Sequence, residues 1–450
     1  MPTTASHTKK KEELAARLRD SSGAVALQKD TSNLFRDRAG APRRRLDVRN
    51  FNEVLSVGEG FVEAEGMTPY ETLVDACLPH GVMPAVVPQL KTITLGGALA
   101  GVGIESSSHR YGLVHDTVLE ADVLLGDGRI VTCARDNEHA DLFFGFPNSY
   151  GTLGYALRVK ARTIPVKPYV RLSHLPFKDP VLYFRELERH LNSRSVDFID
   201  GTVFGPGEMY ITLGHFSDTA PYTSDYTFES IYYRSIREKR EDYLTIRDYI
   251  WRWDTDWFWC SKNVFAQNPL LRKYAFGKER LGSRTYTKIM RWNSRAGVTK
   301  RLERLLGLHS ESVIQDVDIP IARAAEFLDF YARNIALWPQ WVCPIGFDAQ
   351  RAGNLPRAFT LYPMRHDWYV NFGFWDVKRT REAHPPGHFN RMIERKVTEL
   401  GGIKSLYSDS FFPEPEFERL YGGETYRGLK ARYDPAGAFP GLYAKCVLRE

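Results

Sequence analysis

A glycine-rich stretch constrains this chain more than any other feature. It runs PQLKTITLGGALAGVGIESSSHRYG from Pro88 to Gly112. Glycine lets the backbone come close to a ligand, and its N–H groups can hydrogen-bond phosphate oxygens. The spacing matches neither the GxGxxG of a Rossmann dinucleotide site nor the GxxxxGK[ST] of a P-loop. The stretch therefore predicts either a phosphate-binding loop of another kind or a tight packing turn.

The composition sets the class of protein. The chain has 450 residues, of which 43% are hydrophobic and 26% charged, values that indicate a globular protein of two or three domains. The longest charge-free stretches are shorter than the run of about 18 apolar residues that a membrane-spanning helix needs. Met1–Lys11 is polar and does not look like a secretory signal. We expect a cytoplasmic protein.

Neither the cysteines nor the net charge predicts a metal site or a nucleic-acid site. The five cysteines are far apart and form no CxxC pair, so buried reduced thiols are expected and no metal site is predicted. The net charge of +6 is mild, and basic residues are not interleaved with aromatics, which argues against nucleic acid. The basic runs Lys9–Lys11 and Arg43–Arg45 are either solvated faces or contacts to anionic phospholipid headgroups at the inner face of the cell membrane.

The pattern of strands and helices predicts an α+β fold. Val118–Leu125 and Arg129–Cys133 flank Gly126-Asp127-Gly128, which is typical of a hairpin. A boundary is expected at Pro165–Pro168. Beyond it we expect a mixed or antiparallel sheet, an aromatic helix and several amphipathic helices. Expected strands there are Ser312–Ile319, Trp341–Phe347 and Tyr369–Trp375; expected helices are Tyr243–Trp259, Ala322–Ile335, Phe389–Leu400 and Glu414–Tyr421.

The glycine-rich stretch is the first of an ordered set of motifs. After Thr94-Leu95-Gly96-Gly97 come Tyr111-Gly112, His115-Asp116, Leu125-Gly126-Asp127-Gly128, Asp141-Leu142-Phe143 and Ser149–Gly154. This set resembles the FAD-binding domain of the vanillyl-alcohol oxidase/p-cresol methylhydroxylase (PCMH) family. The resemblance implies a two-subdomain FAD-binding domain over residues 1–168, a substrate or cap domain over 169–400, and a C-terminal segment, 401–450, that returns to the flavin.

The resemblance also implies which residues bind FAD. Those expected to line the pyrophosphate and isoalloxazine are Thr94, Leu95, Gly96, Gly97, Gly101, Gly103, Ser106, Ser107 and Ser108, completed by Tyr111, Gly112 and His115. Those expected on the ribityl and adenine side are Asn148, Ser149, Gly151, Thr152 and Gly154. The RGGG-type phosphate turn usual after the first strand is replaced by Gln28–Leu34. Its Lys29, Thr31, Ser32 and Asn33 either contact the pyrophosphate or form a surface turn.

Two branches of the family look most similar to this chain. Gly103–Leu113 is similar to the loop of Δ24-sterol reductases, which implies noncovalent FAD. The runs Trp251–Cys260, Val87–Thr94, Lys404–Asp409 and Leu420–Glu424 resemble bacterial reductases of methyl-branched fatty acid synthesis. That resemblance implies reduction of a mid-chain methylene group to a methyl branch on a phospholipid-bound acyl chain, as in tuberculostearic acid. It further implies NADPH or NADH as electron donor and a companion methyltransferase.

Such a reaction needs an apolar tunnel and a proton donor. The aromatics of Trp251–Trp259 either line the tunnel or form domain core. Candidate acids are Tyr407, Asp316 (or its neighbour Gln315), Asp254 with Asp256, and Asp409. Alternation along Ser312–Ile319 places Gln315, Val317 and Ile319 on one face and Asp316 and Asp318 on the other. Tyr407 is the first choice, because its ordinary pKa keeps it protonated.

Other functions fit the same residues. The flavin could instead desaturate a methylated acyl chain, as in furan fatty acid pathways, or the chain could act on a sterol. A noncatalytic partner subunit of a methyltransferase is the alternative from another class. The leading interpretation is an FAD-dependent oxidoreductase that acts on a CH–CH group in lipid metabolism.

Overall fold

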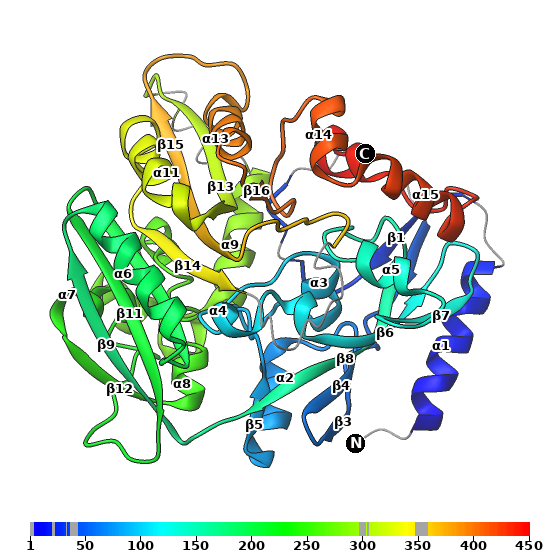
Figure 1. The fold of residues 1–450 in the computed structure, drawn as a ribbon, viewed down its shortest axis with the longest axis horizontal. Helices are drawn as coiled ribbons and strands as arrows, with labels where there is room; N and C mark the ends of the chain where they lie inside the picture. The colour runs from blue at the N-terminus through cyan, green and yellow to red at the C-terminus, as the bar shows by residue number, and fades with distance from the viewer. Residues whose placement is uncertain are drawn as a thin grey trace.

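Two antiparallel sheets organise the molecule (Figure 1). The computed structural model describes residues 4–19, 23–32, 34–36, 44–296, 303, 306–346 and 359–450. The α+β class predicted from the sequence is confirmed. The chain leaves the first sheet at Pro165 and enters the second at Tyr169.

The first sheet has the order β3-β4-β8-β6-β7, with β5 paired to β8. Its strands are β3 (Val54–Gly58), β4 (Phe61–Glu65), β5 (Val82–Pro84), β6 (Val118–Leu124), β7 (Ile130–Ala134) and β8 (Tyr155–Pro165). The expected hairpin joins β6 to β7. Short helices fill the connections: α2 (Tyr70–Cys77), α3 (Leu95–Ala100), α4 (Ser108–Tyr111) and α5 (Ala140–Gly145).

The second sheet has eight strands, all paired antiparallel, in the order β12-β9-β11-β10-β14-β15-β13-β16. Its strands are β9 (Tyr169–Phe177), β10 (Phe198–Gly205), β11 (Glu208–Ser217), β12 (Glu241–Thr245), β13 (His309–Pro320), β14 (Gln340–Gly346), β15 (Trp368–Thr380) and β16 (Ile403–Lys404). The predicted strands Ser312–Ile319, Trp341–Phe347 and Tyr369–Trp375 correspond to β13, β14 and β15, although Phe347 lies outside the described residues.

Three longer helices cover one face of this sheet. They are α6 (Pro180–Ser193), α11 (Ile321–Asn334) and α13 (His388–Glu399), whose apolar side chains pack against alternate residues of the strands. On β15, Phe372 and Phe374 join this core, whereas Tyr369 joins the core shared with the first sheet. Strand alternation therefore turns Gly373 and Trp375 toward the first sheet. Near the C-terminus, α14 (Glu414–Leu420) packs on α15 (Gly423–Tyr433), and α15 lies beside α5 (Figure 1).

The N-terminal helix α1 (Thr4–Arg19) packs on the first sheet through Leu14, Ala15 and Leu18. A two-stranded parallel sheet, β1 (Val25–Gln28) with β2 (Arg44–Asp47), follows it. Lys10 pairs with Glu53 at 2.6 Å and Glu65 at 3.1 Å, and Lys11 pairs with Asp122 at 2.8 Å.

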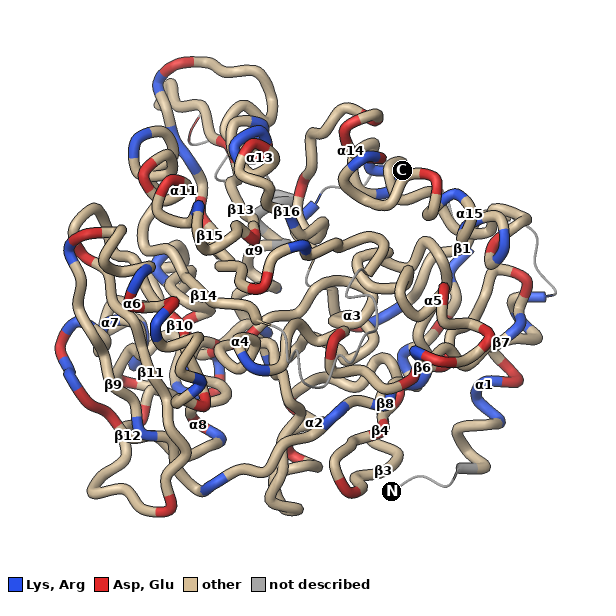
Figure 2. Tube along the Cα trace, in the orientation of Figure 1, with Lys and Arg blue, Asp and Glu red and all other residues tan. Residues whose placement is uncertain are grey.

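These ion pairs change the interpretation of the basic runs. Figure 2 marks the Lys and Arg positions of α1 in blue along the tube trace. Lys10 and Lys11 are half-buried against carboxylates and are engaged in holding α1 to the domain, which leaves Lys9 as the exposed member of its run. Arg44 and Arg45 are exposed, and Arg43 lies outside the described residues. Lys9–Lys11 is therefore a helix-docking segment rather than a free cationic patch.

The aromatic segment Tyr243–Trp259 is not the single helix that the sequence predicts. Tyr243 belongs to β12, a one-turn helix α8 (Ile246–Ile250) follows, and residues 251–259 form consecutive turns. The sequence pattern could not distinguish a helix from successive turns here, because nearly every aromatic side chain of the segment is buried, whichever way it points. Among the described residues, no helix is both long and apolar enough to cross a bilayer.

Candidate active site

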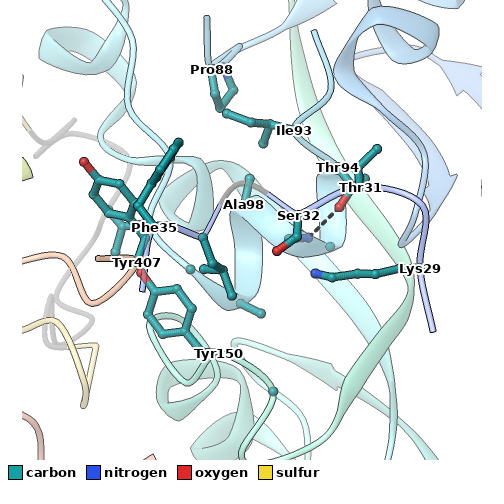
Figure 3. A pocket seen from close by; sticks show the side chains of 18 of the residues that line it. Lys29, Thr31, Ser32, Phe35, Pro88, Ile93, Thr94, Ala98, Tyr150 and Tyr407 are labelled. Carbon is teal, nitrogen blue, oxygen red and sulfur yellow. Dashed lines mark hydrogen bonds between the residues drawn. The ribbon is translucent and has the colours of Figure 1, made fainter. Parts of the chain in front are cut away.

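One elongated pocket lies between the two sheets and gathers segments from both ends of the chain. Figure 3 shows Lys29, Thr31, Ser32 and Thr94 on one side of the cavity and Phe35, Tyr150 and Tyr407 on the other. The pocket therefore has a polar end built by the β1–loop segment and the glycine-rich stretch, and an aromatic end that reaches the second sheet. Lys445 and Glu450 also line it.

The glycine-rich stretch forms one wall. Thr94 caps α3, its Oγ1 accepting from the Gly97 N–H at 3.2 Å. A Cβ at Gly97 would lie 2.7 Å from that oxygen, and one at Gly101 would lie 3.1 Å from the Gly97 carbonyl. Backbone is thus the only surface that this wall can offer to a ligand at these points. Pocket-lining members of the predicted set are Thr94, Gly96, Gly97, Gly101 and Gly103.

The segment after β1 forms the facing wall at the polar end. Lys29, Thr31 and Ser32 all line the pocket, in the position where the sequence departs from the usual glycine turn. Asn33 lies outside the described residues. An ammonium and two hydroxyls opposite a wall of closely approaching glycine backbone make a polar site suited to a diphosphate.

A tight turn supplies the third wall. Asn148, Tyr150 and Gly151 all have positive φ, of 62°, 50° and 77°. The Asn148 amide donates to the Leu361 carbonyl at 2.7 Å, which holds this strained turn. Tyr150, Gly151 and Gly154 line the pocket, whereas the buried side chains of Asn148, Ser149 and Thr152 do not.

The rest of the predicted cofactor set lies behind the pocket wall. Ser107 Oγ donates to the Ala85 carbonyl at 2.7 Å, and Ser106 Oγ lies 2.8 Å from Tyr249 Oη. The His115 ring packs edge-on to Phe359 with centroids 4.4 Å apart. These contacts fix the loop that carries the lining glycines. The predicted residues in this position, none of which lines the pocket, are Leu95, Ser106, Ser107, Ser108, Tyr111, Gly112 and His115.

Two buried N–H donor groups on the lining have no hydrogen-bond partner among the described residues. One is Nε2 of Gln89 and the other is Nη2 of Arg36. Arg36 uses Nη1 to donate to the Leu406 carbonyl at 2.6 Å and stacks over Tyr150 at 4.9 Å. Unpaired buried donors cost free energy unless a ligand pairs with them. With the glycine wall, they show that the pocket fits a large polar, anionic and aromatic cofactor such as FAD.

An acid cluster lies at the aromatic end. Asp316 on β13, Trp375 on β15 and Tyr407 after β16 all line the pocket. Trp375 Nε1 donates to Tyr407 Oη at 2.9 Å. Burial, with a smaller contribution from Asp318, raises the pKa of Asp316 to about 8, although Tyr407 opposes the shift. Burial likewise raises the pKa of Tyr407 well above its usual value. Both acids therefore hold their protons at neutral pH.

Room for the Asp316 carboxyl comes from a glycine across the ladder. Asp316 faces Gly373 in the register of β13 with β15. A Cβ at Gly373 would lie 2.7 Å from Asp316 Oδ1 and 2.6 Å from the Trp375 ring. The alternation predicted for β13 is confirmed, because Val317 and Ile319 pack under the helices while Asp316 reaches the pocket.

The other candidate acids do not line the pocket. Asp254 Oδ1 accepts from the Lys91 N–H at 2.9 Å and from Ser283 Oγ at 2.6 Å, so this carboxylate joins two loops. Asp256 pairs with Arg272 at 2.7 Å. Asp409 faces Arg449 at 3.4 Å, and Gln315 donates to Asn390 beneath the sheet. Their placement removes the geometric basis for a role as proton donor.

Aromatic rings enclose the space around the acid cluster. Phe258 packs on Trp375 with ring centroids 4.3 Å apart, and Trp257 packs on Phe35 at 5.6 Å. Trp257 and Phe258 have φ of 44° and 60°, a left-handed conformation that bulky residues rarely adopt. This strain turns two successive rings toward the pocket. Trp251, Trp253 and Trp259 are buried core and do not line it.

The side chains that could form a covalent flavin link are placed elsewhere. Both ring nitrogens of His109 lie near carbonyl oxygens, of Ser106 at 2.8 Å and of Val196 at 3.2 Å. In the part of the chain that the structure describes, no histidine or cysteine lines the pocket.

Comparison with known proteins identifies the class. A family model described as an FAD binding domain matches residues 8–134, which include the glycine wall, most of α1 and the loop after β1. The chain carries an FAD-binding domain of the PCMH type and is an FAD-dependent oxidoreductase, as the sequence predicts.

The similarity to individual proteins extends beyond that domain. The chain is 29% identical to the Δ24-sterol reductase of Mus musculus over 373 residues, covering 80% of this chain and 69% of the relative. It is 28% identical to the Homo sapiens enzyme over 413 residues, covering 89% and 75%. Cytokinin dehydrogenase 6 of Oryza sativa subsp. japonica is 30% identical over 175 residues, 38% of this chain and 32% of the relative. The similarity to Δ24-sterol reductases thus spans both sheets, which makes these enzymes homologues of the chain.

The sequence alone did not single out several lining residues. Phe35, Arg36, Gln89, Tyr150 and Trp375 come from four separate segments. A signal existed for two of them, because Gln89 lies inside the stretch Pro88–Gly112 and Tyr150 lies inside the motif Ser149–Gly154.

Proposed function

We propose that this chain uses noncovalent FAD to reduce an isolated C=C bond in a long apolar lipid chain. The specific substrate proposed is a mid-chain methylene group on a phospholipid-bound acyl chain, which would become a methyl branch. The observation that carries the proposal is the acid cluster of Asp316 and Tyr407 at the aromatic end of the pocket.

The chain's own residues would hold the cofactor along the pocket. Lys29, Thr31, Ser32 and the Gly97 wall suit the diphosphate, and Arg36 and Gln89 offer their unpaired donors nearer the aromatic end. FAD bound there would supply hydride, renewed from NADPH or NADH. Because the C=C bond is not conjugated to a carbonyl, a proton must reach the neighbouring carbon as hydride arrives.

Tyr407 is placed to give that proton. Its oxygen accepts a hydrogen bond from Trp375, which fixes the ring and stabilises the oxygen as the proton leaves. Asp316, protonated at neutral pH, stands beside it and can return a proton to the same oxygen. The aromatic rings exclude water, so the two acids keep their protons until substrate is present.

The apolar wall sets the substrate class. Burying a methylene group contributes about 0.8 kcal/mol, so a long alkyl chain gains most from a site lined by Phe35, Trp257 and Phe258. Resemblance of Trp251–Cys260 and Lys404–Asp409 to the acyl-chain reductases supports a phospholipid. A methyltransferase that makes the methylene group would be the companion enzyme.

A sterol side chain is the second candidate. It is favoured by the 28–29% identity to Δ24-sterol reductases over 80–89% of the chain. It presents the same isolated double bond in an apolar skeleton. The reverse reaction, desaturation of a methylated acyl chain, would use the same pocket.

Lipid mass spectrometry tests these alternatives. The chain is expressed with and without a fatty acid methyltransferase, and the masses of the methylated acyl chains are measured. Gain of two hydrogens on a methylene chain supports the proposal; loss of two hydrogens supports desaturation; change confined to added Δ24-sterols supports the second candidate.

The Tyr407→Phe variant tests the role of the acid. Flavin absorbance and flavin reduction by NADPH or NADH should persist, while alkene reduction should slow by about 10²–10⁴-fold. Tyr222→Phe, an exposed tyrosine far from the pocket, is the matched control. Turnover of Tyr407→Phe equal to that control would exclude Tyr407 as the donor.

A further inference from the structure

Half of the large apolar side chains exposed among the described residues lie in one short segment. Twelve such side chains are exposed, and six fall between residues 265 and 292: Phe265, Leu270, Leu271, Tyr274, Met290 and Trp292. Tyr274 is 77% exposed, Phe265 71% and Trp292 63%. Scattered exposed apolar residues are ordinary, but a cluster of this kind marks an interaction surface. We propose that this surface, the 265–292 surface, docks on an anionic lipid bilayer.

Local contacts hold the segment together as one surface. Leu271–Phe276 forms a helical turn, and the Phe276 ring packs on Tyr286 of α9 (Ser283–Ala296) at 6.5 Å between centroids. Trp292 follows Tyr286 by six residues, about 9 Å along the helix axis. The exposed rings of Tyr274 and Trp292 are thus carried on neighbouring elements.

Charge identifies the partner. Residues 265–296 contain eight Lys or Arg and one Glu. Arg272 is buried in an ion pair with Asp256 and is not part of the surface. Five basic side chains are exposed beside the single exposed Glu279: Lys273, Lys278, Arg280, Arg284 and Lys288, of which Lys278 and Arg284 face Asp225 and Glu71. Aromatic and aliphatic side chains interspersed with Lys and Arg are the composition that enters the headgroup region of anionic membranes.

The same charge argues against a second copy as the occupant. A two-fold interface would place this surface against itself and bring its exposed Lys and Arg side chains against their own copies. Repulsion between them would oppose the gain from burying the apolar side chains. An anionic bilayer satisfies both the charge and the apolar side chains.

The surface adjoins the wall of the active site. Phe258 lines the pocket, and Phe265 follows seven residues later, within about 25 Å even if the chain were extended. Cys260–Val264 forms a turn between them, and Lys262 pairs with Asp376 next to Trp375. Docking would bring the apolar end of the pocket close to the bilayer. This use of the surface rests on the proposed lipid substrate, whereas the docking itself does not.

Vesicle cosedimentation of the FAD-loaded protein tests the proposal. Vesicles of phosphatidylcholine with phosphatidylglycerol should bind the protein, and phosphatidylcholine alone should bind it weakly. The double variant Tyr274→Ser/Trp292→Ser should bind the anionic vesicles about tenfold less tightly or worse, because apolar insertion is lost. A second variant, Lys273→Gln/Lys288→Gln, should lose about fivefold for each lysine and show a weaker salt dependence.

The matched control replaces an exposed apolar pair elsewhere. Val181 and Leu182 on α6 are 53% and 52% exposed, and Val181→Ser/Leu182→Ser should bind vesicles like the parent. Unchanged flavin absorbance verifies folding of every variant. Parent-level binding by Tyr274→Ser/Trp292→Ser, or a parent dimer that this variant converts to a monomer, overturns the proposal.

Activity separates this proposal from the proposed function. On substrate dispersed in detergent, Tyr274→Ser/Trp292→Ser should turn over like the parent. Tyr407→Phe should bind vesicles but fail to reduce the substrate. Binding without any lipid reduction by the parent would refute the proposed function and leave the docking surface standing.

Discussion

Replacing Asp316 with Asn should change how stability depends on pH in a defined window. In the folded chain burial raises the pKa of Asp316 from 3.8 to about 8. Between these values the folded state keeps a proton that the unfolded state has lost, so this group makes stability fall as pH rises. The slope is about 1.4 kcal/mol per pH unit, and it ends above about pH 8, where both states are ionised.

Asn has nearly the same shape and cannot ionise. The stability of Asp316→Asn relative to the parent should therefore rise by about 4 kcal/mol between pH 5 and pH 8 and then stay constant. Thermal unfolding of both FAD-saturated proteins across pH 5–9 measures this difference, because pH effects of most other groups cancel between them. Asp409→Asn, the same change outside the pocket, controls for the substitution itself. A difference that is flat above pH 5 would show Asp316 ionised at neutral pH and refute its role as a proton reserve.

Three further substitutions separate binding, catalysis and architecture. Gly97→Trp should place a ring on the glycine wall and abolish flavin absorbance. The control Gly428→Trp, where a Cβ would meet no atom within 4 Å, should retain flavin absorbance. Full flavin occupancy in Gly97→Trp would show that the diphosphate binds elsewhere. Gly373→Ala should push against Asp316, lower stability by about 1–3 kcal/mol and slow alkene reduction while flavin still binds, as unfolding and single-turnover assays would show. Asp254→Ala should lower the melting temperature, by a loss of about 1–3 kcal/mol, yet leave turnover of the folded enzyme near the parent's; a large fall in turnover would restore Asp254 as a candidate acid.

Local patterns predicted the parts of the site that are built locally. Glycines and a threonine cap in one stretch specify a close backbone wall, and Thr94, Gly97 and Gly101 line the pocket. Alternation along β13 separated Asp316 from Gln315, because side chains of a strand point to opposite faces by geometry alone.

What the sequence missed depends on contacts between distant segments. Arg36 reaches the pocket by bonding the Leu406 carbonyl, and no pattern near residue 36 encodes that partner. In the sequence, Lys10 and Lys11 look like an exposed basic run. Their carboxylate partners, Glu65 and Asp122, are distant along the chain and come close to them only in the folded sheet. The sequence predicts a helix at Trp257 and Phe258. In the fold both residues have a left-handed backbone, because packing outweighs their local preference.

The bond between Arg36 and Leu406 has a consequence for synthesis on the ribosome. Its two ends are 370 residues apart, and Val25 N–H similarly donates to the Ala438 carbonyl. At typical elongation rates the second partner emerges about 20–75 s after the first. Throughout that interval the N-terminal wall of the pocket lacks the segment that closes it. FAD is therefore captured by the finished chain, and translation that stops before residue 406 yields a polypeptide that cannot retain its cofactor.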